Sequence, residues 1–369
     1  MKKQIEFIIT LLLIFILITA GIINIKNPKN ERSTGKIQIV TTLFPQYDFV
    51  KQIGGDKVDV VLLLPPGSES HTYEPTPQDM QQINNSDLFV FTGEEMEPWA
   101  DNLISGLKND IRVLDLSKTV DLINSEEFEE EHEGEGHEHD EGLEHEHNHD
   151  EDLDDEHDHE HEKEQEHQDE DDSNDDHKNE TEDEHHHEHD EHHHTYDPHI
   201  WLNPQYAIQM VKSIESELIA IDPENSEYYK KNAEQYIAEI QQLDSEFEDT
   251  VKNSSNPKIA FGGAFAYAYF VERYNLDFIS AYETCGESAE PSTTKMKEVI
   301  EYIRKNKIPV VFYKEYTSGT IAKTLSEATG AKMLVFNTVH NVSKNELQNG
   351  ATYVSIMREN LENLKQALK

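Results

Sequence analysis

The sequence predicts an α/β protein of two lobes, each built on a mostly parallel sheet, with one long helix joining them. Short runs rich in Val, Ile and Leu alternate with stretches whose apolar residues recur at helical spacing. Continuous apolar strands separated by helices are typical of parallel sheets buried on both faces. The alternation occurs twice, before and after an acidic interruption, and a long amphipathic segment precedes the second set.

The first set predicts four strands with helices between them. The expected strands cover 37–43, 58–64, 88–91 and 111–116. The expected helices cover 46–53, 78–83 and 99–107. After the interruption, a helix is expected over 204–220 and the long one over 223–252, whose length of about 45 Å is enough to pass from one lobe to the other. The second set predicts strands at 258–261, 276–282, 309–313 and 333–337, and helices at 264–274, 293–305, 318–329 and 346–367.

The N-terminus carries an export signal. Two lysines follow Met1, and an apolar run then extends to Ile23. This run is longer than the apolar region of most signal peptides and close to the length that spans a bilayer. Ile22 occupies the place of the modified cysteine in what resembles a lipoprotein cleavage site. We therefore favour an uncleaved anchor over a cleaved signal peptide, and both place the bulk of the chain outside the cytoplasm.

These patterns divide the 369 residues into five parts. We expect a signal or anchor over 1–25, a polar tether over 26–36, an N-terminal lobe over 37–222, a linking helix over 223–253 and a C-terminal lobe over 257–369. The N-terminal lobe contains the acidic interruption, residues 124–195. We expect the chain to be a monomer.

The acidic interruption is rich in histidine. Of the 21 histidines, all except His71, His199 and His340 lie between His132 and His194, among Asp and Glu. The loop has too few apolar residues for burial to offset the conformational entropy lost on ordering. We therefore expect it to be disordered without metal. The sequence has no basic patch and the acidic loop would repel phosphates, so we expect no nucleic-acid partner. The loop is interpreted as a weak collector of divalent cations, with a solvated spacer as the alternative.

One match within the loop is misleading. His145 and His149, with Glu146 between them, have the spacing of a zinc protease motif. That chemistry needs a helix holding both imidazoles on one face, and the acidic flanks offer no apolar face for such a helix. We therefore predict that the chain is not an enzyme.

The three isolated histidines predict a metal site in the cleft between the lobes. His71 and His340 each follow a predicted strand, and His199 precedes a predicted helix, with Asp197 placed to cap that helix or brace the imidazole. Ligand sites of open parallel sheets gather beyond the carboxyl ends of the strands. Imidazole donors suit Zn²⁺ better than Mn²⁺, which prefers oxygen.

Two motifs resemble those of a known family, the extracytoplasmic metal-binding receptors of bacterial ATP-binding-cassette importers for zinc and manganese. The motifs are the loop that begins His71-Thr72-Tyr73-Glu74-Pro75 and the segment Asp197-Pro198-His199-Ile200-Trp201. Residues 353–361 are similar to the family's C-terminal helix, and an acidic His-rich insertion is typical of its zinc-handling members. The resemblance covers nearly everything after residue 36. It implies two α/β lobes, a rigid linking helix and metal bound in the cleft.

The chain departs from the family pattern at two positions. Zinc members usually carry a histidine where this chain has Gly262, which has no side chain to offer. The position that often supplies an acidic ligand is His340 here. The fourth ligand stays open among Glu283, Cys285 (the single cysteine), Glu287, Glu290, Glu315 and a water molecule.

Together these features predict an extracytoplasmic, high-affinity zinc receptor that delivers Zn²⁺ to the membrane permease of an ATP-binding-cassette importer. The alternatives are a receptor for manganese or another divalent metal on the same fold, and a surface zinc buffer or adhesion protein. A zinc hydrolase would need an open coordination position beside a general base.

Overall fold

The structure is a computed structural model that describes residues 35–108, 111–133, 195–282 and 291–369. The expected anchor, nearly all of the tether and most of the acidic loop lie outside these residues. Within them, no helix combines the length and the apolar character needed to cross a membrane. Both sheets described below belong to one compact unit.

The first sheet is parallel and has the strand order β2-β1-β3-β4. Its strands are β1 (Ile37–Thr41), β2 (Val58–Leu62), β3 (Leu88–Phe91) and β4 (Arg112–Asp115). The helices between them are α2 (Phe44–Gly54), α3 (Pro77–Asn84) and α4 (Ala100–Ser105). Every residue of the central strand β3 is buried, as its unbroken apolar sequence predicts.

The second sheet is also parallel and has the strand order β6-β5-β7-β8. Its strands are β5 (Lys258–Phe261), β6 (Asp277–Ser280), β7 (Val310–Tyr313) and β8 (Lys332–Val335). Its helices are α8 (Ala268–Tyr274), α9 (Thr293–Asn306), α10 (Thr320–Thr329), α11 (Lys344–Gln348) and α12 (Tyr353–Ala367). In both sheets the first strand in the chain lies between the second and the third. The prediction of two parallel α/β lobes is confirmed.

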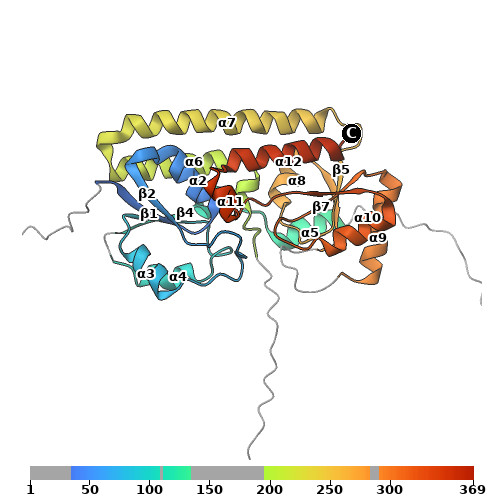
Figure 1. Cartoon of the computed structure of the whole chain (residues 1–369), viewed down its shortest axis with the longest axis horizontal. Coiled ribbons are helices and arrows are strands. Elements are labelled where there is room, and N and C mark those ends of the chain that lie inside the picture. Colours follow the sequence, from blue (N-terminus) through green and yellow to red (C-terminus); the bar gives the residue numbers. More distant parts are fainter. Residues whose placement is uncertain (1–34, 109–110, 134–194, 283–290) are drawn as a thin grey trace, which may run out of the picture. The chain divides into compact units, whose positions relative to one another are not determined.

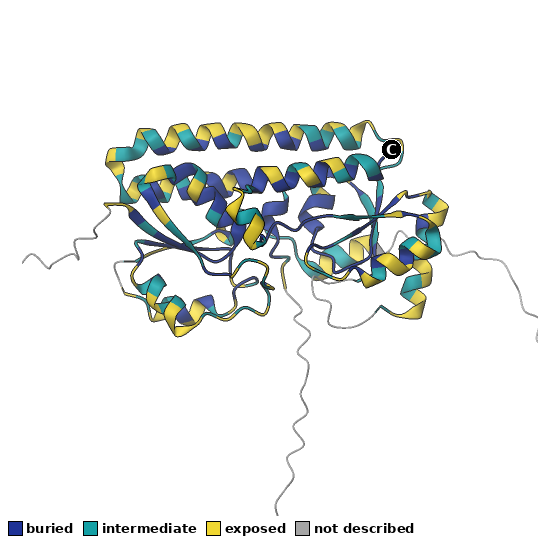
Figure 2. Ribbon diagram, viewed as in Figure 1, coloured by how far each residue is buried: buried dark blue, intermediate teal, exposed yellow. Residues whose placement is uncertain are grey.

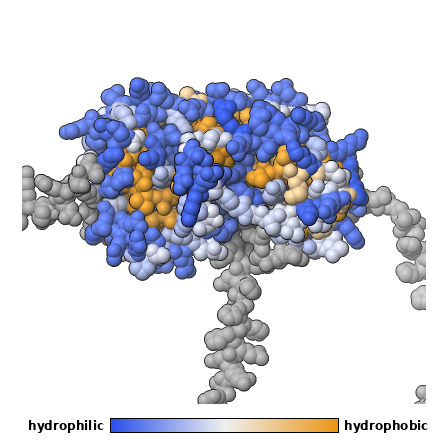
Figure 3. Space-filling view, viewed as in Figure 1, coloured by the Kyte–Doolittle hydropathy of each residue, from blue (hydrophilic) through white to orange (hydrophobic). Residues whose placement is uncertain are grey.

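One long helix runs alongside both lobes (Figure 1). This helix, α7 (Ser226–Lys252), has 27 residues and follows α6 (Pro204–Ile221) after a single 3₁₀ turn. Its length is about 40 Å. It packs against α6, α2 and α12, so it contacts helices of both lobes. Figure 2 shows buried residues on the side of α7 that faces these helices, and Figure 3 shows a mostly hydrophilic outer side.

The most extensive of three apolar core clusters formed by the residues that the structure describes continues from one sheet into the other. It includes Ile39 and Val90 from the first sheet, and Ile259 and Phe312 from the second. All four side chains are almost completely buried. The two lobes are therefore packed together along one side, and their sheets hold the intervening loops in place.

Two predicted helices differ from those observed. The helix expected over 346–367 is two helices, because Gly350 adopts a left-handed conformation with φ of 76°. Thr352 then begins α12 with a capping box in which its side chain accepts from the Ser355 backbone. The helix expected over 264–274 begins only at Ala268, and residues 264–267 are buried but form no regular secondary structure.

The start of the acidic loop was predicted wrongly. Disorder was expected from residue 124 onward, but the segment begins with a helix, α5 (Ser125–Glu133). Phe128 explains why, because its ring stacks against Phe265 and Phe278 of the second lobe, with centroid separations of 6.2 and 5.9 Å. Asn124 caps this helix by accepting a hydrogen bond from the Glu127 backbone at 3.1 Å.

Candidate metal centre

His71 lies in the loop between β2 and α3, and this loop is structured by its own polar contacts. Thr76 caps α3, and its backbone N–H donates to Asp79 Oδ2 at 2.8 Å. Tyr73 donates to the same carboxylate at 3.1 Å. The backbone N–H of His71 donates to Glu69 Oε1 at 3.4 Å, and its side chain is partly buried. The loop is therefore organised on both sides of the histidine.

His199 is fully buried and immediately precedes the 3₁₀ turn Ile200–Leu202. Asp197 Oδ1 accepts from the His199 backbone at 2.7 Å and lies 3.0 Å from Nδ1 of the ring. Because a carboxylate only accepts, Nδ1 carries the proton and Nε2 has a lone pair. Nε2 is buried, and no described residue forms a hydrogen bond with it. Asp197 thus braces the imidazole, whereas Asn203 caps the following helix.

His340 is held by a chain of polar contacts that follows β8. Thr338 Oγ1 donates to Glu315 Oε1 at 2.6 Å and forms a short contact with His340 Nδ1. With the threonine proton on Glu315, Nδ1 of His340 is assigned as the donor to Thr338, which leaves Nε2 with the lone pair. Burial lowers the pKa of His340 well below its usual range, and the charges of Lys314, His71 and His199 lower it further.

The structure brings the three isolated histidines towards one another. The rings of His71 and His199 have a centroid separation of 5.5 Å. His340 is close enough to both for their charges to affect its pKa. In the described part of the chain, however, no three His, Cys, Asp or Glu side chains stand close enough together to hold a metal ion in their present positions. A metal ion would therefore require these side chains to move closer together, or a donor from outside the described residues.

Of the candidates for a fourth ligand, only Glu315 lies within the described residues. Its carboxyl group is buried and accepts from both the hydroxyl and the backbone N–H of Thr338, the latter at 2.9 Å. Oε1 lies 3.4 Å from His340 Nδ1. The structure thus places Glu315 behind the imidazole, as the outer partner that orients it. Glu283, Cys285, Glu287 and Glu290 lie outside the described residues.

The glycine that departs from the family pattern has a structural reason. A Cβ atom added to Gly262 would lie 2.6 Å from the Cα and 2.9 Å from the backbone nitrogen of Ala322, in α10. Real Cβ atoms do not approach backbone this closely, so no side chain fits at this position without moving the helix. A histidine ligand at position 262 is therefore incompatible with the packing of α10 in this chain.

Sequence reasoning missed several polar residues that support the histidines. Trp201 Nε1 donates to the Thr338 carbonyl at 2.7 Å, which joins the turn after His199 to the loop of His340. Asn341 and Lys314 contact the loop of His71 from the second lobe. These contacts join residues more than 130 positions apart, and no local pattern signals them. Glu315 was already among the predicted candidates for the fourth ligand. Thr338 could have been found with it, because the two residues follow neighbouring strands of one parallel sheet.

Two lobes on parallel sheets, one long helix alongside both, and imidazoles at the loops between the lobes define the class of metal-binding solute receptors. Solved structures share this fold. The metal-dependent lipoprotein YcdH from Bacillus subtilis has a TM-score of 0.66 at 30% identity, covering 90% of this chain and 99% of that one. The Zn(II)-bound ZnuA-like domain of Streptococcus pneumoniae AdcA has a TM-score of 0.65 at 27% identity, over 90% and 99% of the two chains.

The chain belongs to the ZnuA family, described as zinc-uptake complex component A, periplasmic, whose model matches residues 39–367. It is 32% identical over 334 residues to the high-affinity zinc uptake system protein ZnuA of Bacillus subtilis, covering 90% of this chain and 88% of the relative. It is 30% identical to the zinc-binding lipoprotein AdcA of Streptococcus pneumoniae, but it spans only 56% of that protein's length.

Proposed function

We propose that this chain is an extracytoplasmic receptor that binds Zn²⁺ through His71, His199 and His340 and delivers it to the permease of an ATP-binding-cassette importer. One observation carries the proposal. His199 Nε2 is a buried lone-pair nitrogen with no hydrogen-bond partner among the described residues, and Asp197 holds its ring in the tautomer that a metal requires. Leaving such an atom unsatisfied is costly, and a bound metal removes the cost.

Several features favour zinc as the cargo. All three proposed ligands are imidazoles. The carboxylates of Asp197 and Glu315 contact ring Nδ1 atoms, and that of Glu69 accepts from the His71 backbone. Manganese prefers more oxygen donors. The relatives named above are a zinc uptake protein and a zinc-binding lipoprotein. We infer a receptor that is not an enzyme, acts as a monomer and stays at the membrane through its N-terminal segment.

The acidic histidine-rich loop has a separate role in this proposal, as a weak zinc collector beside the tight site. Its ends are joined by hydrogen bonds from Ser125 N to the Thr195 carbonyl at 3.1 Å and from Asp197 N to the Ile123 carbonyl at 3.0 Å. Because α5 carries the chain about 13 Å away from this paired point before the loop begins, residues 134–191 are replaced by a short Gly-Ser linker. Such a deletion retains α5 and its Phe128 contacts.

The test is competitive titration with Zn²⁺ and Mn²⁺ against chelators of graded affinity. His71→Ala, His199→Ala and His340→Ala are compared with the unmodified chain, and His132→Ala serves as a control for loss of one imidazole from the acidic loop. Asp197→Asn should weaken zinc binding by about 10–100-fold, the usual effect of a lost outer partner, and His199→Ala should weaken it more.

The deletion of 134–191 separates the two zinc-binding roles. We expect one tight, zinc-selective site to survive it while the weak sites disappear. Loss of all tight binding on deletion, with no effect from the three single alanine variants, would refute the proposal. It would show that the three histidines are structural and that the chain is a zinc buffer.

A further inference from the structure

The loop that carries His71 is attached to the second lobe by the residue next to His340. Asn341 is fully buried, and its Nδ2 donates to the Pro65 carbonyl at 3.0 Å and to the Ser68 carbonyl at 2.7 Å. Its Oδ1 accepts from the Val342 backbone at 2.7 Å. The amide therefore uses both of its protons across the interface, and one side chain connects the backbones on which two of the proposed ligands lie.

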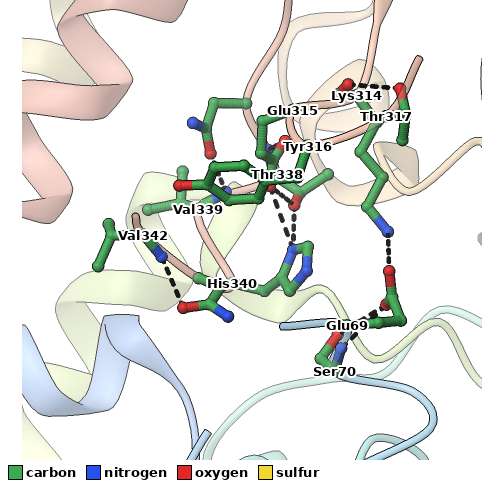
Figure 4. A network of polar contacts seen from close by, with 12 residues as sticks. Glu69, Ser70, Lys314, Glu315, Tyr316, Thr317, Thr338, Val339, His340 and Val342 are labelled. Carbon is green, nitrogen blue, oxygen red and sulfur yellow. Dashed lines mark hydrogen bonds and ion pairs between the residues drawn. The ribbon is translucent and has the colours of Figure 1, made fainter. Parts of the chain in front are cut away.

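A second attachment reaches the same loop from the end of β7. The ammonium group of Lys314 lies 3.5 Å from Glu69 Oε2, and the lysine side chain is only 5% exposed (Figure 4). The other oxygen of Glu69 accepts from the backbone of Ser70 at 3.0 Å and of His71 at 3.4 Å. A buried ammonium is costly without a partner, so Lys314 holds the carboxylate, and the carboxylate holds the backbone of His71.

We propose that Asn341 and Lys314 are positioning residues that latch residues 65–71 to the second lobe and so set the spacing between His71 and His340 before metal arrives. This inference rests on the proposed function, because it requires both histidines to bind the metal. A loop held in place loses less conformational freedom when its ligand is bound. A released loop must be ordered during binding, and the affinity falls accordingly.

Loss of a buried asparagine can lower the stability of the fold without changing the metal site. Asn360 provides the matched control for that effect. It is as buried as Asn341 and makes two similar bonds, accepting from the Asn337 backbone at 2.7 Å and donating to the Asn337 carbonyl at 2.7 Å. Both bonds lie within the second lobe. Replacing either asparagine by alanine removes a satisfied buried amide, but only Asn341 connects the two lobes.

The experiment uses the full-length chain with Asn341→Ala, Lys314→Met and Asn360→Ala. Hydrogen exchange of residues 65–76 without metal reports the latch itself, and competitive Zn²⁺ titration reports its effect on the site. The absorption spectrum of bound Co²⁺ reports the geometry of the ligands. We expect both Asn341→Ala and Lys314→Met to exchange faster over 65–76 and to change the Co²⁺ spectrum. Asn341→Ala should bind zinc about tenfold more weakly. Lys314→Met should lose less affinity, because removing a cation near the site favours a divalent metal. Asn360→Ala should lower the melting temperature and leave all three readouts unchanged.

The latch is refuted if both variants exchange like the native chain, or if the zinc affinity of Asn341→Ala stays within threefold of it. It is also refuted if Asn360→Ala reproduces their effects, because general destabilisation would then account for them. Failure of the proposed function is recognised separately, since the unmodified chain itself would show no tight zinc binding in the same titration.

Discussion

Glu97 is the buried acid for which the structure makes the sharpest prediction about pH. Thr42 Oγ1 lies 2.8 Å from Gln46 Oε1 and forms a short contact with Glu97 Oε1. Gln46 Oε1 also accepts from the Leu43 backbone at 2.8 Å, which identifies it as the amide oxygen. One hydroxyl proton cannot serve two acceptors. The contacts are satisfied together if Thr42 donates to Gln46 and a protonated Glu97 donates to Thr42.

The electrostatic surroundings of Glu97 agree with a neutral carboxyl group. Burial raises the pKa of Glu97 from 4.5 to about 7, against the opposing effect of its hydrogen bonds with Thr42, Gly93 and Thr92. In the folded state the group therefore keeps its proton at pH values where the unfolded chain has lost it. The resulting stability is fully present below about pH 4.5 and is lost as the pH rises to about 7. The full difference is about 3 kcal/mol.

The assay is urea-induced unfolding of the native chain and Glu97→Gln, without metal, at pH 5 and pH 8. The glutamine is neutral at both values, so the native chain should lose about 2–3 kcal/mol relative to the variant between them. Glu74→Gln, on an exposed loop, controls for the loss of one acidic group. A difference between the native chain and Glu97→Gln that does not change with pH would refute the reasoning, because it would mean that Glu97 is already ionised in the folded protein at pH 5.

Two further predictions concern packing, and both are measured as free energies of unfolding. Gly262→Ala should destabilise the metal-free chain by about 1–3 kcal/mol, because its Cβ would overlap the backbone of Ala322. Gly106→Ala is the control, because its Cβ would meet only ordinary contacts, and it should change stability by less than about 1 kcal/mol. Equal effects at both glycines would contradict the steric argument. Phe128→Ala should lower the free energy of unfolding by at least about 1 kcal/mol through its lost aromatic contacts. Val113→Ala, at a more exposed site, serves as the control and should change it little. An unchanged free energy for Phe128→Ala would show that α5 does not depend on this packing.

The strands were predictable because continuous burial leaves a signal that needs no knowledge of the partner. Residues 88–91 and 258–261 coincide with β3 and β5, whose side chains are almost all buried. Helix boundaries were less predictable where one residue decides them. Gly350 and the Thr352 capping box separate α11 from α12, yet the apolar spacing continues across them and suggests one helix. Capping signals therefore carry information that periodicity conceals.

The helix α5 was missed for a different reason. Its sequence is acidic, and Phe128 is the single large apolar residue within it. The aromatic rings that bury this residue, Phe265 and Phe278, lie far along the chain in the second lobe. No local pattern predicts such an isolated contact. The general location of the candidate site was easier to predict than α5, because the loops that follow parallel strands converge at one edge of the sheet whatever their sequences are.

The arrangement of the site determines which of its parts must move to exchange metal. A wide opening of the lobes would expose a core that both sheets share, and it would break the bond from Trp201 to the Thr338 carbonyl. His199 and His340 lie within this packed region and are almost completely buried. His71 is only partly buried, and its loop is held by a few polar contacts, one of them to the half-exposed Glu69. Under the proposed function, metal therefore enters and leaves by displacement of the His71 loop. The strength of the latch then sets a compromise, because contacts that raise affinity by fixing this loop also slow the release of zinc to a permease.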